Sequence, residues 1–159
     1  VEILYTVIPF IIVAVLFYFT VIKENKIVDK TTPVKHEISV NGFQWSWQFE
    51  YPAAGEDAVV TGTPAAPPTL YLPQGESVRL TLNSSDVVHG FWIPAFMIQM
   101  QNLPGETNQL QFTANKIGEF PGRCNILCGR NHSQMLFKVK VVSPENYQKY
   151  LDSLKASAA

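Results

Sequence analysis

The pattern of hydrophobic and polar positions divides the chain near residue 35. Residues 3–22 carry no charged side chain, and about 20 apolar residues in a helix cross a hydrocarbon core of roughly 30 Å. We therefore expect a membrane-spanning helix within residues 1–24 and a linker over residues 25–35. The acidic Glu2 in place of a basic start favours a span over a cleaved signal peptide.

From His36 onward the hydrophobic period changes to two, which is typical of β-strands. The alternation predicts one long strand from His36 to Tyr51, and the Ala/Pro/Gly-rich residues 53–68 predict a surface loop. Three further short strands are expected within residues 78–82, 110–113 and 137–141. Short strands separated by turns predict an all-β sandwich or barrel over residues 36–143.

The C-terminal residues 144–159 return to helical spacing. Ser143 is placed to cap a helix and Pro144 occupies its first position. We expect a short helix that packs on the sandwich.

Composition and charge exclude several classes of function. The chain has 159 residues and a formal net charge of −1, so it lacks the basic footprint of a nucleic-acid-binding protein. It contains no recognisable phosphate-binding glycine loop or nucleophile elbow, which disfavours a kinase or hydrolase. Its size suits one compact domain with one additional element.

Soft metal ligands are concentrated in twelve residues, where Cys124, Cys128, His132 and Met135 follow one another. A second imidazole, His89, lies upstream. Sulfur and imidazole ligands with a thioether favour copper, and a second thiolate indicates a second metal ion. A disulfide or a zinc site is the alternative for the two cysteines, although either would leave Met135 unexplained.

The spacing Cys-x-x-x-Cys-x-x-x-His-x-x-Met resembles the dinuclear copper loop of cytochrome c oxidase subunit II. Three other segments are similar to that family, and the resemblance covers essentially the whole chain: Phe43-Gln44-Trp45-Ser46-Trp47, Asp86-Val87-Val88-His89 and Leu103-Pro104-Gly105. It implies a cupredoxin-like sandwich with one N-terminal transmembrane helix and a short C-terminal helix.

The resemblance also implies a ligand set for two copper ions. Both cysteines would bridge the coppers, and the remaining ligands would be His89, His132, Met135 and the backbone carbonyl of Ile126. The family usually has Glu at the position of Ile126, where its carboxylate binds magnesium, and often an acid near Gln101. We therefore expect no magnesium ligand from this chain.

Two further residues receive roles only through the resemblance. Trp45 matches the tryptophan at which electrons enter, although an aromatic residue on a half-buried strand is generally packing, as we expect for Trp47. Glu2 matches a carboxylate near the start of a proton path, although an acid in the first helical turn is also favoured by the helix dipole.

The implied function is that of an electron-transfer subunit of a bacterial respiratory haem-copper oxidase. It would accept electrons from cytochrome c and pass them to haem in subunit I, where oxygen is reduced. The alternatives are a membrane-tethered copper carrier or copper-delivery protein outside an oxidase, and an ectodomain with a disulfide or zinc site. Residues 36–159 carry ten acidic and eight basic side chains, a slight excess that is compatible with a basic cytochrome.

The orientation in the membrane has two opposing indications. Lysines 23, 26, 30 and 35 follow the span and would place the domain in the cytoplasm by the positive-inside tendency. The family resemblance implies a copper domain on the outer side. We expect the outer side, because large domains cross membranes largely regardless of charge.

Overall fold

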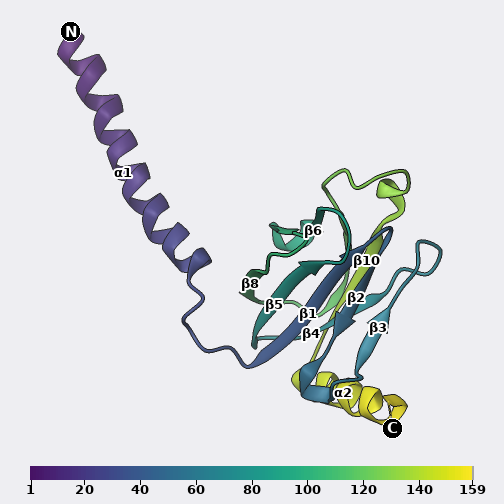
Figure 1. Ribbon diagram of the computed structural model, residues 1–159. Helices are drawn as coiled ribbons and strands as arrows, with labels where there is room; N and C mark the ends of the chain where they lie inside the picture. Colours follow the sequence, from purple (N-terminus) through teal and green to yellow (C-terminus); the bar gives the residue numbers. More distant parts are fainter. Residues whose placement is uncertain (159) are drawn as a thin grey trace. The chain divides into compact units, whose positions relative to one another are not determined.

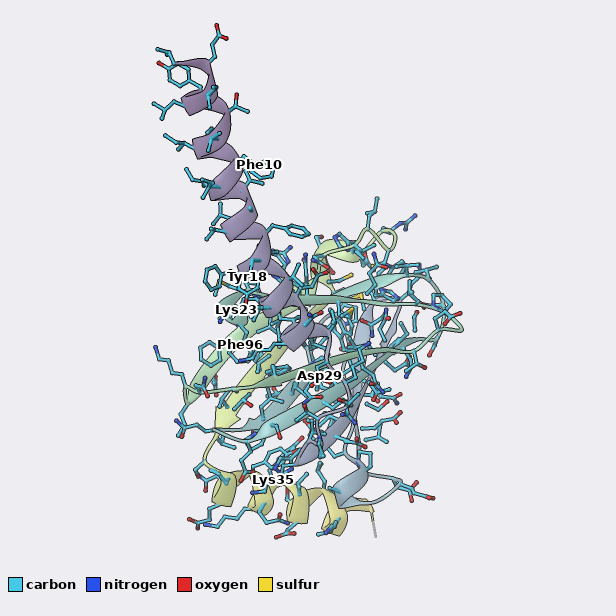
Figure 2. All side chains as sticks on the ribbon, turned by 90° about the vertical axis from the view of Figure 1, so that its left-hand side faces the viewer. Phe10, Tyr18, Lys23, Asp29, Lys35 and Phe96 are labelled. Carbon is cyan, nitrogen blue, oxygen red and sulfur yellow. The ribbon has the colours of Figure 1, made fainter. Side chains whose placement is uncertain are left out.

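The computed structural model describes residues 1–158 and divides the chain into two units, Val1–Pro33 and a β domain that begins at Val34. Helix α1 (Glu2–Val28) forms the first unit and runs unbroken through Pro9 (Figure 1). Its side chains are exposed around the whole helix, as Figure 2 shows for Phe10 and Tyr18. The helix is long and apolar enough to cross a membrane.

The second unit contains two five-stranded sheets, with strand orders β3-β2-β1-β5-β8 and β4-β10-β9-β6-β7. The first sheet comprises β1 (His36–Phe43), β2 (Ser46–Glu50), β3 (Val59–Thr61), β5 (Ser77–Ser84) and β8 (Asn108–Thr113). The second comprises β4 (Thr69–Pro73), β6 (His89–Ile93), β7 (Ile98–Asn102), β9 (Gly118–Cys124) and β10 (Leu136–Val142). The predicted all-β sandwich is confirmed.

The expected long strand from His36 to Tyr51 is wrong, because the chain turns at Gln44 and Trp45. β1 and β2 pair as an antiparallel hairpin with Gly42 opposite Trp47. The backbone N–H of Gln44 donates to the carboxylate of Asp86 at 2.7 Å instead of continuing a strand. The expected loop over residues 53–68 is also more ordered than predicted, since it contains β3 and most of the 3₁₀ helix η1 (Pro52–Ala54).

Alternating apolar residues from both sheets form the core between them. Trp47 is fully buried and packs edge-to-face against Phe91 at 5.6 Å and Phe137 at 5.4 Å between ring centroids. Phe91 and Phe137 stack at 4.7 Å. Trp47 therefore packs in the core, as predicted, and its cluster supports the strands that carry the candidate ligands.

Helix α2 (Pro144–Ala158) lies at the end of the sandwich opposite the loop between β9 and β10 (Figure 1). The hydroxyl of Ser143 accepts a hydrogen bond from the backbone N–H of Asn146 at 3.3 Å, which caps the helix as predicted. Tyr147 and Leu151 are buried. The expected helix packed on the sandwich is confirmed.

Candidate metal centre

The loop that carries most of the candidate ligands is closed at its base by two paired strands. β9 ends at Cys124 and β10 begins directly after Met135. The backbone N–H of Cys124 donates to the carbonyl of Met135 at 3.0 Å, and the 3₁₀ helix η3 (His132–Gln134) forms the returning turn. The first and last side chains of the predicted ligand loop are therefore held beside each other.

Strand β6 brings His89 to this loop from an earlier part of the chain. β6 pairs with β9, with Phe91 opposite Cys124, and the N–H of Gly90 donates to Cys124 Sγ at 3.4 Å. A Cβ atom on Gly90 would lie 1.9 Å from Asn125 Oδ1, so any larger residue would force the side chain of Asn125 to move. His89 is fully buried against the loop.

The sulfur atoms are close together without forming a disulfide. Cys124 Sγ and Cys128 Sγ lie 3.8 Å apart, whereas a disulfide requires about 2.05 Å, and both cysteines are free and buried. Cys128 Sγ also lies 3.7 Å from Met135 Sδ and 3.6 Å from His132 Nδ1. The carbonyl oxygen of Ile126 lies 3.2 Å from Cys124 Sγ.

This arrangement has the dimensions that a soft metal requires. The ligand atoms of His89, Cys124 and Cys128 all lie within 4.8 Å of one another. Two sulfur atoms that bind one metal at about 2.3 Å with a tetrahedral angle are separated by about 3.8 Å. The structure thus brings the six predicted ligand residues together as a candidate metal site.

The imidazole of His89 is oriented for ligation by Asp86. His89 Nε2 lies 2.8 Å from Asp86 Oδ1, which favours the tautomer with its proton on Nε2. The other nitrogen, Nδ1, is buried and has no hydrogen-bond partner among the residues that the structure describes. A buried nitrogen with a free lone pair fits a metal ligand, because leaving it unpaired is otherwise costly.

The two thiols differ in their tendency to ionise. Burial raises the pKa of Cys124, but the neighbouring His89 and the N–H of Gly90 outweigh burial and lower the pKa to about 6. Burial and the adjacent Cys124 charge raise the pKa of Cys128 to about 12. The two thiols therefore do not ionise equally, and Cys128 must lose its proton before both sulfurs can bind a metal.

Trp45 lies against the ligand loop from the β1–β2 turn. Its Nε1–H donates to the carbonyl of Cys128 at 3.1 Å, and the side-chain amide of Gln44 donates to the same oxygen at 2.8 Å. The next residue, Gly129, has φ 120°, and a Cβ there would lie 3.1 Å from the Trp45 ring. Trp45 is half-buried, and its indole forms a hydrogen bond with the backbone of a candidate ligand residue.

Sequence reasoning missed the supporting roles of Asp86, Gln44 and Gly90. Asp86 had a usable signal, because a carboxylate three residues before a candidate ligand histidine can reach its ring. The sequence contains no signal for the role of Gln44, because that role depends on a turn that the sequence did not predict. Glu2 belongs to the other unit, where it lies exposed in the first turn of α1.

The side chain of Ile126 lines a cavity of about 370 Å³ beside the site. The other lining residues are Gln99, Met100, Gln101 and Asn125. This lining contains no carboxylate, the side-chain group through which proteins usually bind Mg²⁺. The absence of a magnesium ligand from this chain remains our prediction.

Comparison with known proteins identifies a matching protein family and similar sequences. Residues 65–142 match the family described as the periplasmic domain of cytochrome c oxidase subunit II. A probable cytochrome c oxidase subunit 2 of Streptomyces avermitilis is 41% identical over 97% of this chain, and one of Streptomyces coelicolor is 38% identical. The chain spans 60% of the length of both relatives.

A solved structure supports the same relationship. The periplasmic domain of subunit II of cytochrome oxidase from Bradyrhizobium japonicum superposes with a TM-score of 0.73 and 26% identity. The match covers 80% of this chain and 99% of that domain. The predicted cupredoxin-like class is thereby confirmed.

Proposed function

Since this chain belongs to the cytochrome c oxidase subunit II family, we propose that it is the electron-accepting subunit of a respiratory haem-copper oxidase. It would receive single electrons from cytochrome c and pass them to haem in subunit I, which would reduce oxygen. The observation that carries the proposal is the pair of free cysteines 3.8 Å apart, with two imidazoles and a thioether around them.

Copper is the proposed metal, and two bound ions would supply one-electron redox chemistry. The two cysteines would bridge the ions and the other ligands would complete the two coordination environments: His89, His132, Met135 and the carbonyl of Ile126. The burial of Cys124, Cys128 and Met135 excludes water from the site. Anchoring on paired strands limits ligand movement when the charge of the site changes.

Three further roles belong to this proposal. Trp45 would conduct electrons from the docked cytochrome, because its indole is bonded to the backbone of Cys128. Helix α1 would anchor the domain in the bacterial membrane, with the copper domain on the outer side. Glu2 would lie near the start of a proton path in the assembled complex.

Metal content tests the proposal directly. We expect two coppers per folded chain, together with an electron paramagnetic resonance spectrum in which two coppers share one unpaired electron. One copper per chain, or zinc retained in preference under copper-replete conditions, would contradict the dinuclear site. Isolation with a larger haem-containing subunit would separate an oxidase from a free-standing copper protein.

Asp86→Asn is expected to weaken copper binding by about tenfold, the lower end of the usual effect of removing a group that orients a metal ligand. The amide retains the shape of Asp86 but not the charge that favours the observed orientation of His89. Affinity can be measured by competition with a chelator. Glu106→Gln is the matched control, since Glu106 is an exposed acid in the neighbouring β7–β8 turn, and equal effects of the two changes would refute the role of Asp86.

A further inference from the structure

Charged side chains are distributed unevenly between the two ends of the β domain. Of the ten acidic residues after residue 35, only Asp86 and Glu106 lie at the end that carries the candidate metal centre. The others lie on or near α2, on the turns at the opposite end, or at strand ends near those turns: Glu37, Glu50, Glu56, Asp57, Glu76, Glu119, Glu145 and Asp152. The slight acidic excess of the domain is therefore absent from the surface around Trp45.

The carboxylate of Asp86 is already engaged by neighbouring groups. It lies 2.8 Å from His89 Nε2 and accepts hydrogen bonds from the backbone N–H groups of Gln44 at 2.7 Å and Val87 at 2.6 Å. These contacts stabilise the ionised carboxylate and direct it toward His89 and the β1–β2 turn. Its side chain is 31% exposed, so Asp86 and Glu106 leave only a small acidic surface at this end.

Basic and apolar side chains project from the same end. Leu127 is 80% exposed although it lies between two candidate ligand residues, and Val87 is 39% exposed. Arg130 is exposed on the loop next to Gly129, which packs on Trp45. Leu127 and Val87 thus give this end exposed apolar side chains, and Arg130 adds a positive charge to it.

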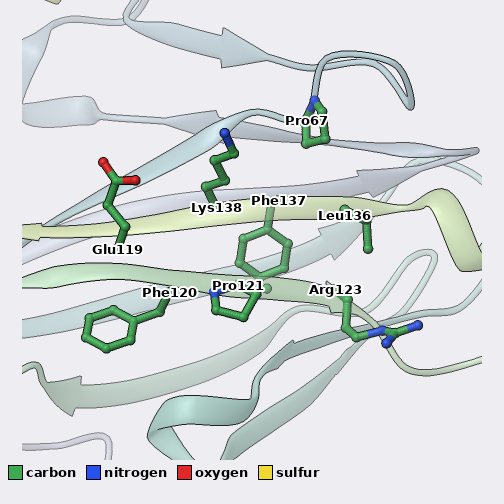
Figure 3. Close-up of a pocket in the computed structure, with 9 residues that line it drawn as sticks. Pro67, Glu119, Phe120, Pro121, Arg123, Leu136, Phe137 and Lys138 are labelled. Carbon is green, nitrogen blue, oxygen red and sulfur yellow. The ribbon is translucent and has the colours of Figure 1, made fainter.

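The outer face of β9 and β10 extends this surface. Arg123 immediately precedes Cys124 and pairs with Leu136, and Figure 3 shows the two side chains at one end of a groove. The groove has a volume of about 400 Å³, and Pro121 and Lys138 also line it. Glu119 lines the far end of the groove, so the surface that continues from the ligand loop is apolar and basic only near Arg123 and Leu136.

We propose that the haem protein that donates electrons at Trp45 docks through an apolar face rimmed with acidic groups. This inference rests on the proposed function and specifies its partner. Leu127 and Val87 would supply apolar contact, while Arg123 and Arg130 would attract the acidic rim. Complementary charge of this kind mainly accelerates association and loses its effect as ionic strength rises.

Docking can be measured independently of electron transfer by using the full metal-free chain in a neutral detergent. Binding of an acidic and a basic oxidised c-type cytochrome is compared at low and high salt. We expect the acidic cytochrome to bind more tightly at low salt and to weaken as salt is added. Arg130→Glu should weaken that binding by about fivefold at low salt, because it reverses one charge at the contact.

Lys116→Glu is the matched control, because it makes the same charge change on an exposed side chain at the opposite end of the domain. We expect it to change binding by less than about twofold. Tighter low-salt binding of the basic cytochrome, or equal effects of the two reversals, would overturn the inference. If the acidic cytochrome binds as expected but the copper-loaded chain accepts no electrons, docking is supported and the proposed function fails.

Discussion

Cys128→Ser is expected to destroy the dinuclear centre, with loss of at least one copper per chain and of electron acceptance. Cys128 Sγ lies within 3.8 Å of Cys124 Sγ, Met135 Sδ and His132 Nδ1, so it occupies the middle of the candidate ligand set. A serine hydroxyl is similar in size but does not supply a soft, bridging thiolate. Copper analysis and electron paramagnetic resonance measure the loss, and far-ultraviolet circular dichroism verifies folding.

Met135→Leu is the informative comparison, because leucine approximates methionine in volume and polarity. A neutral thioether mainly tunes the potential of a copper site, so this variant should retain most copper while its potential shifts and onward transfer slows. If Met135→Leu changes neither property while His132→Ala abolishes copper binding, Met135 is a packing residue. Retention of two coppers and the shared-electron spectrum by Cys128→Ser would refute the bridging role.

Trp45→Phe is expected to slow electron transfer from cytochrome c far more than it changes copper content. Phenylalanine preserves an aromatic ring beside Gly129 but removes the hydrogen bond from Nε1 to the carbonyl of Cys128. Copper content should stay unchanged, because the indole is a proposed path and not a ligand. Stopped-flow reduction at saturating cytochrome measures the effect.

Trp92→Phe provides the control for Trp45, since it makes the same substitution at a half-buried tryptophan on β6. We expect transfer in this variant to remain close to that of the unaltered chain. Unchanged transfer in Trp45→Phe would make Trp45 a packing residue. A loss of copper in Trp45→Phe would instead indicate that its hydrogen bond stabilises the loop.

The sequence predicted the elements whose signals are local and periodic. Residues 3–22 lack charge, and the period of two after His36 indicated a sandwich, as the structure confirms. The β1–β2 turn was missed because Gln44 and Trp45 are not typical turn residues. Their conformation depends on Asp86 and Cys128, which lie far away in sequence.

For the candidate ligands too, the sequence predicted features that depend on neighbouring residues and missed features that depend on contacts distant in sequence. The spacing from Cys124 to Met135 is by itself sufficient to indicate a soft-metal loop. That spacing does not specify the orientation of His89, which depends on the pairing of β6 with β9 and on Asp86. Spacing thus predicted which side chains meet, while long-range contacts determine how they are held.

The position of His89 on β6, apart from the loop that carries the other candidate ligands, implies an order of events during biogenesis. An unfolded chain can present the loop sulfurs to a metal, but the histidine arrives only after β6 has paired with β9. A delivery protein that loads a complete centre must therefore act on a domain that is already folded. The complete ligand set therefore exists only in the folded domain, and we expect the binding of metal to stabilise the pairing of β6 with β9.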